Sequence, residues 1–311
     1  ASPAGTSYIY KDKKGNYWIG TSNGLYSYQP HTGTYQQKLR FASEGGFYCM
    51  TEDEEGKLYI SVYSKGLYIY DTQTGDVKIL SSSMRSNKGA LCNDWIRAMM
   101  FDSEGLLWIG TSNGVSCLDT KTYSFRTFGW NYILPQTQVN CLCEDNEGNI
   151  IIGASEGLYR FQVKENTLKA FPNSEKLATM PICGIVKDKQ GDIWISTTKG
   201  IWYYDSANAQ FIGHVSGNGL RSPECVMGAV VSWPDDKIAI GTTDGITVFY
   251  PNQVKNQNVE MGKVYLTNFI VDGKSIDFMK EEFSVPYSQN SFSLEFSMLN
   301  YKNDEDIIFQ Y

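Results

Sequence analysis

Histidine is almost absent from the sequence, with only His31 and His214 among 311 residues. Catalysis by a histidine base and metal sites with several histidine ligands therefore have little to build on. A phosphate-binding glycine loop of the Walker type is missing as well. Carboxylates are plentiful, but most of them fall in turn motifs that give them a structural role. The sequence predicts a chain that is not an enzyme and has no catalytic residues, metal or other cofactor.

Positive charge is in the minority, because 27 Lys and Arg residues face 34 Asp and Glu residues and the net charge is −7. Phosphate binding needs clustered Lys and Arg, so we expect no nucleic-acid partner. No run reaches the roughly 18 apolar residues of a membrane span. The sequence starts at Ala1 without a Met or a signal-peptide pattern, and we therefore expect it to be part of a longer protein.

Aromatic residues and glycine are abundant, and they recur in a fixed order. A motif that opens with Asp-x-x-Gly and continues to a second glycine occurs first as DKKGNYWIGTSNGLYSY at Asp12. Further copies start at Asp53, Asp102, Asp145 and Asp188, and a degenerate sixth copy, WPDDKIAIGTTDGITVF, starts at Trp233. Successive second glycines are 42 to 48 residues apart. This period, with strand-like content, is the signature of β-propeller blades.

Three columns of the repeat have a physical interpretation. An unbroken isoleucine column fits a pleated surface buried between neighbouring blades: Ile19, Ile60, Ile109, Ile152, Ile195 and Ile240. The preceding position is mostly large and includes Trp18, Trp108 and Trp194, which we interpret as structural. The following position is Gly or Ser, which lets adjacent blades interlock. The Asp of each copy is expected to bond the turn backbone, and its Gly to supply a positive φ.

Each period predicts four strands, of which the one before the Asp is the innermost. The sixth copy lacks an outer strand, because Pro251 and a polar segment follow it directly. Propellers commonly complete the last blade with a strand from the other end of the ring, and that strand would lie upstream of Ala1. We therefore expect six blades of a seven-bladed ring. In the sixth copy Trp233 replaces the Asp and Asp236 replaces the Gly, so its first hairpin is expected to differ.

Seven cysteines are present, and an odd number leaves at least one outside any disulfide within the chain. Cys49 and Cys141 fall on inner strands at a position that crowding near the axis keeps mostly small. Cys141 and Cys143 are too close for a zinc-type Cys-x-x-Cys pair. We predict that these cysteines pack the core.

The pattern changes after the sixth copy. Residues 1–251 are expected to form the propeller, residues 252–263 a linker, and residues 264–311 the start of an Ig-like β-sandwich that is incomplete. VYLTNFIVDGKSIDF predicts a hairpin that turns at Asp272-Gly273. Phe292, Leu294, Phe296 and Met298 alternate along a further strand. Some 50 residues are too few for a two-sheet sandwich of about 100 residues.

The Asp-x-x-Gly-x-x-Trp-Ile-Gly-Thr-x-x-Gly-Leu motif closely resembles the regulator propeller repeat. That repeat occurs in the sensor regions of hybrid two-component systems of Bacteroides-type gut bacteria. The segments NFIVDGK, NSFSLEFSMLNY and FQY resemble the Tyr-rich Ig-like domain that follows those propellers and precedes the transmembrane helix. Together the two resemblances span nearly the whole chain.

The resemblance implies a periplasmic, ligand-sensing ectodomain of an inner-membrane protein. Such proteins detect oligosaccharides and regulate polysaccharide-utilisation genes through a histidine kinase. The resemblance also implies that the full-length protein spans the membrane and forms a homodimer. A fragment of this kind would carry the propeller nearer to the membrane.

Ligands of propellers commonly sit over the axis, on the face where loops lead into the inner strands. Sugar sites combine flat aromatic surfaces with guanidinium, carboxylate or amide groups. Three long loops supply such residues, and we predict ligand contacts by Trp95, Arg97, Trp130, Tyr132, Arg221 and Glu224. The competing interpretation is that Trp95 and Trp130 only pack their loops onto the blades.

Two other functions stay open at the level of sequence. The propeller can be a scaffold that binds protein partners only, or, less favoured, a propeller lyase or glycosidase. Paired catalytic carboxylates depend on a fixed separation that a sequence does not give.

Overall fold

The computed structural model describes residues 6–41, 46–84, 89–126, 134, 136–206, 208–214, 222–255, 264–276 and 291–298. Among these residues nearly all of the regular secondary structure is β-strand, which confirms the predicted all-β fold class. Contacts divide it into two compact units, Ala1–Pro251 and Asn252–Tyr311.

The first unit contains six antiparallel sheets, one for each copy of the repeat, which we number as blades 1 to 6. Blade 1 comprises β1 (Thr6–Lys11), β2 (Tyr17–Thr21), β3 (Gly24–Gln29) and β4 (Thr34–Arg40). Blade 2 comprises β5 (Phe47–Glu52), β6 (Leu58–Val62), β7 (Gly66–Tyr70) and β8 (Val77–Leu80). Blade 3 comprises β9 (Ile96–Phe101), β10 (Leu106–Thr111), β11 (Gly114–Asp119) and β12 (Ser124–Arg126).

Blade 4 comprises β13 (Val139–Glu144), β14 (Ile150–Ala154), β15 (Gly157–Gln162) and β16 (Thr167–Ala170), and the short helix η1 (Glu175–Leu177) follows it. Blade 5 comprises β17 (Ile182–Lys187), β18 (Ile193–Thr197), β19 (Gly200–Asp205) and β20 (Gln210–His214). Blade 6 has three strands, β21 (Cys225–Ser232), β22 (Ile238–Thr242) and β23 (Gly245–Phe249). No fourth strand joins this sheet within the described residues, in line with the missing outer strand that the sequence predicts. The helix α1 (Pro251–Lys255) follows β23 at the start of the segment that was expected to be a linker.

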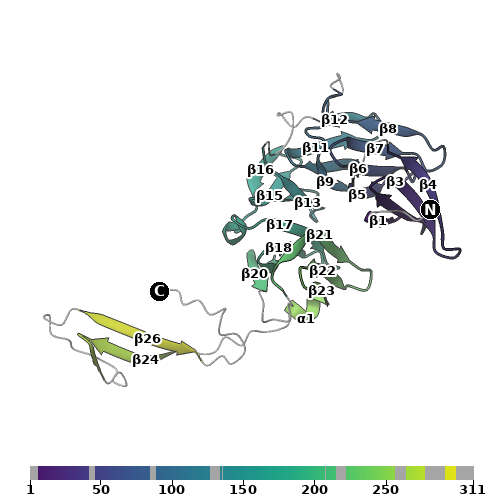
Figure 1. Cartoon of the computed structure of the whole chain (residues 1–311). Helices are drawn as coiled ribbons and strands as arrows, with labels where there is room; N and C mark the ends of the chain where they lie inside the picture. The colour runs from purple at the N-terminus through teal and green to yellow at the C-terminus, as the bar shows by residue number, and fades with distance from the viewer. Residues whose placement is uncertain are drawn as a thin grey trace. The chain divides into compact units, whose positions relative to one another are not determined.

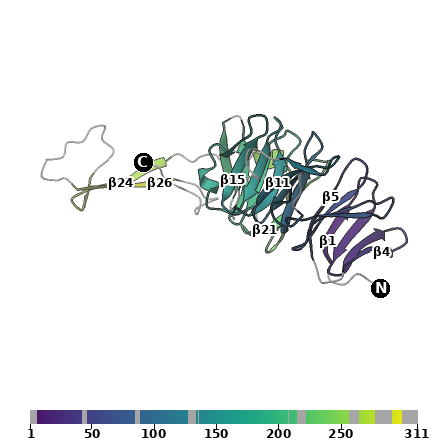
Figure 2. The same ribbon diagram turned by 90° about the horizontal axis from the view of Figure 1, so that it is seen from above.

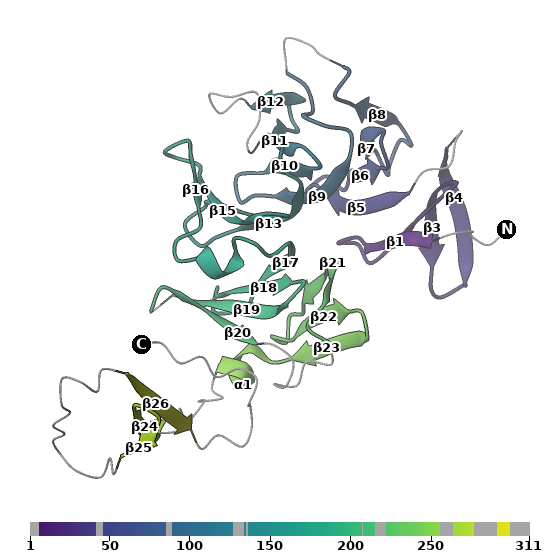
Figure 3. The ribbon, with the colours of Figure 1, turned by 60° about the vertical axis from the view of Figure 1, so that its left-hand side comes forward.

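The blades follow one another in chain order around a common centre (Figures 1 and 2). Their first strands face that centre and their last strands point away from it (Figure 3). Each inner strand packs against the inner strand of the next blade, from β1 and β5 through to β17 and β21. No substantial packing of this kind joins the described strands β21 and β1, so the arc of blades is open.

The isoleucine column lies at equivalent positions in the second strands of all six blades, and every member is buried. The small residue after it admits the next blade. A Cβ added at Gly110 would meet Cγ1 of Val139 at 2.6 Å, and one added at Gly153 would meet Cγ2 of Ile182 at 2.7 Å. The interlocking of large and small residues that the repeat predicted is therefore confirmed.

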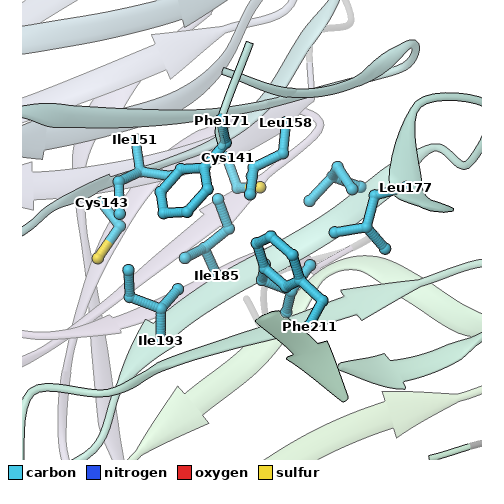
Figure 4. Packing of buried hydrophobic residues seen from close by; sticks show 11 residues of the cluster. Cys141, Cys143, Ile151, Leu158, Phe171, Leu177, Ile185, Ile193 and Phe211 are labelled. Carbon is cyan, nitrogen blue, oxygen red and sulfur yellow. The ribbon is translucent and has the colours of Figure 1, made fainter. Parts of the chain in front are cut away.

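A hydrophobic cluster of described residues fills the interface between each pair of neighbouring blades from blade 1 to blade 5. Between blades 4 and 5, Phe171 and Phe211 lie in one cluster with Ile151, Ile185 and Ile193 (Figure 4). Cys141 and Cys143 lie in the same cluster, 8 % exposed each. Burial raises the pKa of the Cys143 thiol to about 11, so it stays protonated at neutral pH. Both thiols pack the core, as predicted.

The aspartate of each Asp-x-x-Gly turn holds the hairpin from its side chain. Its Oδ1 accepts the amide N–H four residues on, in all five copies that have the Asp. Its Oδ2 accepts the indole N–H of Trp18, Trp108 or Trp194 at 2.7 to 3.0 Å, and the hydroxyl of Tyr59 in blade 2. Burial alone would raise the pKa of Asp12, but the hydrogen bonds from Trp18 and Asn16 lower it below the ordinary value.

In blade 4 a different residue donates the hydrogen bond to Oδ2 of the turn aspartate. Ile151 occupies the place of the tryptophan and has no polar hydrogen to donate. Arg160, on the neighbouring strand β15, donates from Nε to Oδ2 of Asp145 at 2.8 Å and from Nη2 to Oε2 of Glu147 at 2.7 Å. The arginine therefore replaces the missing indole N–H.

Blade 6 keeps the turn although its sequence departs from the motif. The Trp233 amide donates to the Lys237 carbonyl at 2.8 Å, and the Asp236 amide donates to the Trp233 carbonyl at 3.0 Å. These are the two backbone hydrogen bonds of the other copies. Asp236 takes the glycine conformation, with φ 67°, and its carboxylate accepts the Lys189 amide of blade 5. The expected difference in this hairpin is thus confined to side chains.

The second unit contains one described sheet, with β24 (Val264–Val271) between β25 (Lys274–Ser275) and β26 (Phe292–Met298). Asp272 and Gly273 both have positive φ, 45° and 77°. Two positive φ angles define a type I′ turn, so the predicted hairpin is confirmed. Phe292 and Leu294 of β26 are exposed.

Candidate functional site

The two ends of the inner strands define two faces of the propeller unit. The chain enters each inner strand on one face, which we call the entrance face, and leaves it at the Asp-x-x-Gly turn on the other, the turn face. The hairpins between second and third strands return to the entrance face. In blade 3, for example, the Ser112 amide donates to the carbonyl of Trp95, the residue that precedes β9.

A β-bulge lies near the start of every inner strand. One unpaired residue stands there in most blades, such as Ser7, Arg97, Asn140 and Cys183. Bulges re-aim side chains, and here most of them reach the next blade. Ser7 Oγ accepts the Phe47 amide, Asn140 Nδ2 donates to the Ile182 carbonyl, and Cys183 Sγ donates to the Cys225 carbonyl.

Arg97 departs from this pattern, because it turns back toward blade 2. Its Nε donates to Ser112 Oγ at 3.1 Å, and its Cζ lies 5.8 Å from the ring centroid of Tyr48. Tyr48 stands at the bulge of β5, so the two inner strands bring these side chains together on the entrance face.

Three exposed aromatic rings extend from this point. Tyr48 lies 5.8 Å from Tyr63, and Tyr63 lies 5.0 Å from Trp95, between ring centroids. The rings are tilted by 32° and 36° respectively, and each residue is between 38 % and 44 % exposed. We call Tyr48, Tyr63, Trp95 and Arg97 the entrance cluster.

The entrance cluster contains two of the six predicted contact residues, Trp95 and Arg97. The interpretation that Trp95 only packs its loop accounts for the backbone, whose amide donates to Asn93 Oδ1. It does not account for the side chain, because more than a third of the residue is exposed. Glu224 lies at the equivalent position of blade 6, where its carbonyl accepts the Thr243 amide, and no hydrogen bond among the described residues joins it to the cluster. Trp130, Tyr132 and Arg221 lie outside the described residues.

Tyr48 and Tyr63 were missed at the level of sequence, although one signal was present. The second copy of the repeat has one residue more than the others between its isoleucine and its second glycine, and Tyr63 stands in this segment. Ser64 next to it has φ 56°, an uncommon angle for a residue with a side chain. The local departure from the repeat marks the place where the blade presents an extra ring.

Two polar clefts lie on the turn face, away from the entrance cluster. One, of about 290 Å³, lies between blades 4 and 5 and is lined by Arg160, Asp192 and Tyr204 among others. The other, of about 260 Å³, occupies the same place between blades 1 and 2. Arg160 is hydrogen-bonded to Asp145 in the first cleft, so its position there is explained by its structural role.

Enzyme motifs find no support in the geometry of the described residues. The pattern Gly-x-Ser-x-Gly does occur in blades 1, 3 and 4, as GTSNG twice and GASEG. In each case it forms a turn between two antiparallel strands, whereas a nucleophile elbow joins a strand to a helix. Within the described residues, no three His, Cys, Asp or Glu side chains gather as a metal site would require.

No helix in the described part of the chain has the length and hydropathy that a membrane crossing needs. A comparison with curated proteins finds no match to the sequence.

Comparison with solved structures finds the same fold in bacterial ectodomains. The extracellular domain described as part of a hybrid two component system of B. thetaiotaomicron is 24 % identical with a TM-score of 0.72, over 93 % of this chain and 40 % of that one. A second ectodomain, described as part of a one component system of the same bacterium, is 20 % identical with a TM-score of 0.62, over 96 % of this chain and 42 % of its own length. The chain thus spans about two fifths of each.

A propeller enzyme shares the fold at a lower level. Virginiamycin B lyase from Staphylococcus aureus is 14 % identical with a TM-score of 0.57, over 79 % of this chain and 84 % of the lyase. At such identity the likeness concerns the fold alone.

The family model described as two component regulator propeller matches residues 3–23, 90–113, 133–156 and 176–199. Each matched segment ends in the hairpin between the second and third strands of a blade, in blades 1, 3, 4 and 5. Four segments of the chain therefore match the two component regulator propeller repeat.

Proposed function

We propose that this chain is the ligand-sensing part of a signalling protein and that it binds an oligosaccharide at the entrance cluster. The observation that carries the proposal is the row of three exposed rings beside Arg97. Large aromatic side chains are normally buried, and a group of exposed ones on a rigid scaffold marks a binding surface.

The chemistry of the cluster suits a sugar. The faces of Trp95 and Tyr63 offer flat apolar surface to the C–H face of a sugar ring. Tyrosine hydroxyls and the Arg97 guanidinium can hydrogen-bond to sugar hydroxyls at its edge. Tyr48 sits on an inner strand, Tyr63 on a short connection, and Trp95 directly before β9 with its carbonyl bonded to the Ser112 amide, so little ordering entropy is lost on binding.

The remainder of the proposal concerns the full-length protein. We propose that it is anchored in the inner membrane with this chain in the periplasm, acts as a homodimer, and controls polysaccharide-utilisation genes through a histidine kinase. The matched regulator propeller repeats and the fold shared with two-component ectodomains support this assignment. Ligand binding would shift the balance between two arrangements of the ectodomain.

The test is titration of the full-length protein with a panel of oligosaccharides, by calorimetry and thermal shift. A sugar that binds the folded form raises the melting temperature. Trp95→Ala should weaken binding by about tenfold or more, if a sugar ring on the indole contributes as much as a stacked nucleic-acid base, about 1–3 kcal/mol. Trp233→Ala is the matched control, because Trp233 is equally exposed but stands in blade 6, outside the cluster.

Two results would replace the proposal. If no oligosaccharide binds, a scaffold for protein partners becomes the better assignment. If sugars bind and new products accumulate, the chain is an enzyme of the lyase or glycosidase type.

A further inference from the structure

Arg97 has no acidic partner among the residues that the structure describes. Five ion pairs occur among the described residues, and none of them involves Arg97. Its one hydrogen bond in the described structure goes to a neutral hydroxyl, Ser112 Oγ. Arg160, the other half-buried arginine with a defined role, is paired with both Asp145 and Glu147. Arg160 therefore has a structural role, whereas the charge of Arg97 is not neutralised by a described carboxylate.

The guanidinium of Arg97 is held in place rather than free to move. Nε donates to Ser112 Oγ, and the guanidinium carbon lies over the ring of Tyr48. The backbone is fixed as well, because Arg97 stands at the bulge between the paired residues Ile96 and Ala98 of β9. Neither Nη atom has a hydrogen bond to another described residue. Two Nη atoms side by side match the two oxygens of a carboxylate or sulfate.

We infer that the ligand is an acidic oligosaccharide, whose carboxylate or sulfate group is bound by the Nη atoms of Arg97 while the adjoining sugar ring lies on Tyr63 and Trp95. This inference rests on the proposed function and names its substrate class. A neutral sugar would leave the desolvated guanidinium without a charged partner, so the cluster discriminates by charge.

Discrimination between acidic and neutral sugars depends on close contact with Arg97 and not on long-range attraction. The chain carries a net charge of −7, so the field of the whole molecule repels an anion. Attraction must then come from close contact with Arg97, and the affinity for an acidic sugar should fall as salt is added, because exposed charge interactions are screened.

The test compares ligand pairs that differ only in the anionic group, on the full-length protein. Oligogalacturonate against its methyl ester probes the carboxylate, and a sulfated chondroitin oligosaccharide against its desulfated form probes the sulfate. We expect one acidic member to bind about tenfold or more tightly than its partner, in line with a charge-assisted hydrogen bond. Arg97→Gln should remove this difference, and Arg97→Lys should restore part of it, because lysine keeps the charge but loses the planar fork.

The outcomes separate the two proposals. Equal binding of both members of each pair, or an affinity that Arg97→Gln leaves unchanged, overturns the acidic ligand. If a neutral oligosaccharide binds and only Trp95→Ala weakens it, the proposed function stands and this inference is wrong. If no member of the wider panel binds, both fall. Circular dichroism of Arg97→Gln, with Arg160→Gln as the variant expected to lose stability, confirms that the binding data come from a folded protein.

Discussion

Single polar atoms decide how the Asp-x-x-Gly turns are stabilised. Three blades use a tryptophan N–H, one uses a tyrosine hydroxyl, and blade 4 uses Arg160. What the turn requires is therefore a donor to Oδ2 of the aspartate, and not a particular ring. A buried carboxylate oxygen without such a donor would be destabilising.

Arg160→Met tests this substitution of one donor for another. The side chain of Asp145 is 9 % exposed, and in the variant its Oδ2 keeps only the hydrogen bond from Asn149. We expect the free energy of unfolding to fall by about 1–3 kcal/mol. Urea unfolding measures it. The control is Lys169→Met on the facing strand, an exposed position paired with Arg160 across the ladder, which should change stability by less than about 0.5 kcal/mol. Equal effects of the two variants would contradict the role of Arg160.

At the scale of elements, the second strand of each blade governs how the next blade packs. The isoleucine fills the interface on one side, and the small residue beside it makes room for the first inner residue of the next blade, such as Val139 at Gly110. The spacing between sheets is thus set by a single column of the repeat.

Gly110→Ala should disturb this spacing. The new methyl group would meet the Val139 side chain, and overpacking of this kind costs about 1–3 kcal/mol. Gly46→Ala is the comparison, because a Cβ at Gly46 meets nothing within 4 Å. Melting temperatures of the two variants measure the difference. A Gly110→Ala variant as stable as Gly46→Ala would show that the interfaces are not closely packed.

At the scale of the whole propeller unit, the open arc leaves two blade faces uncovered. The residue after the second glycine is 0 % exposed as Leu25 and as Leu67, but 70 % exposed as its counterpart Ile246 in blade 6. Ile9 at the other end of the arc is 62 % exposed, whereas its counterpart Met50 is 4 % exposed. These faces have the composition of an interface, which supports the prediction of a seventh blade without testing it.

Ile246→Asp measures what covers this face. In the 311-residue chain the substitution should change stability by less than about 0.5 kcal/mol, because the side chain is already in water. In the full-length protein a seventh blade would bury it, and we then expect a loss of several kcal/mol from an unpaired buried carboxylate. Leu25→Ala should cost about 2–5 kcal/mol in both proteins. Equal, small effects of Ile246→Asp in both would contradict a closed seven-bladed ring.

The repeat determined the fold, because each column states a local requirement: a turn aspartate, a buried isoleucine, a small neighbour. The periodicity of the sequence was enough to predict that Trp95 and Arg97 lie where the chain enters an inner strand. It could not show that Tyr48 and Tyr63 complete the cluster, because these residues come from a different blade and meet Arg97 only when two inner strands pack. Nor could it show that Arg160 is paired and Arg97 is not, since the partners of a charge are chosen by the space around it.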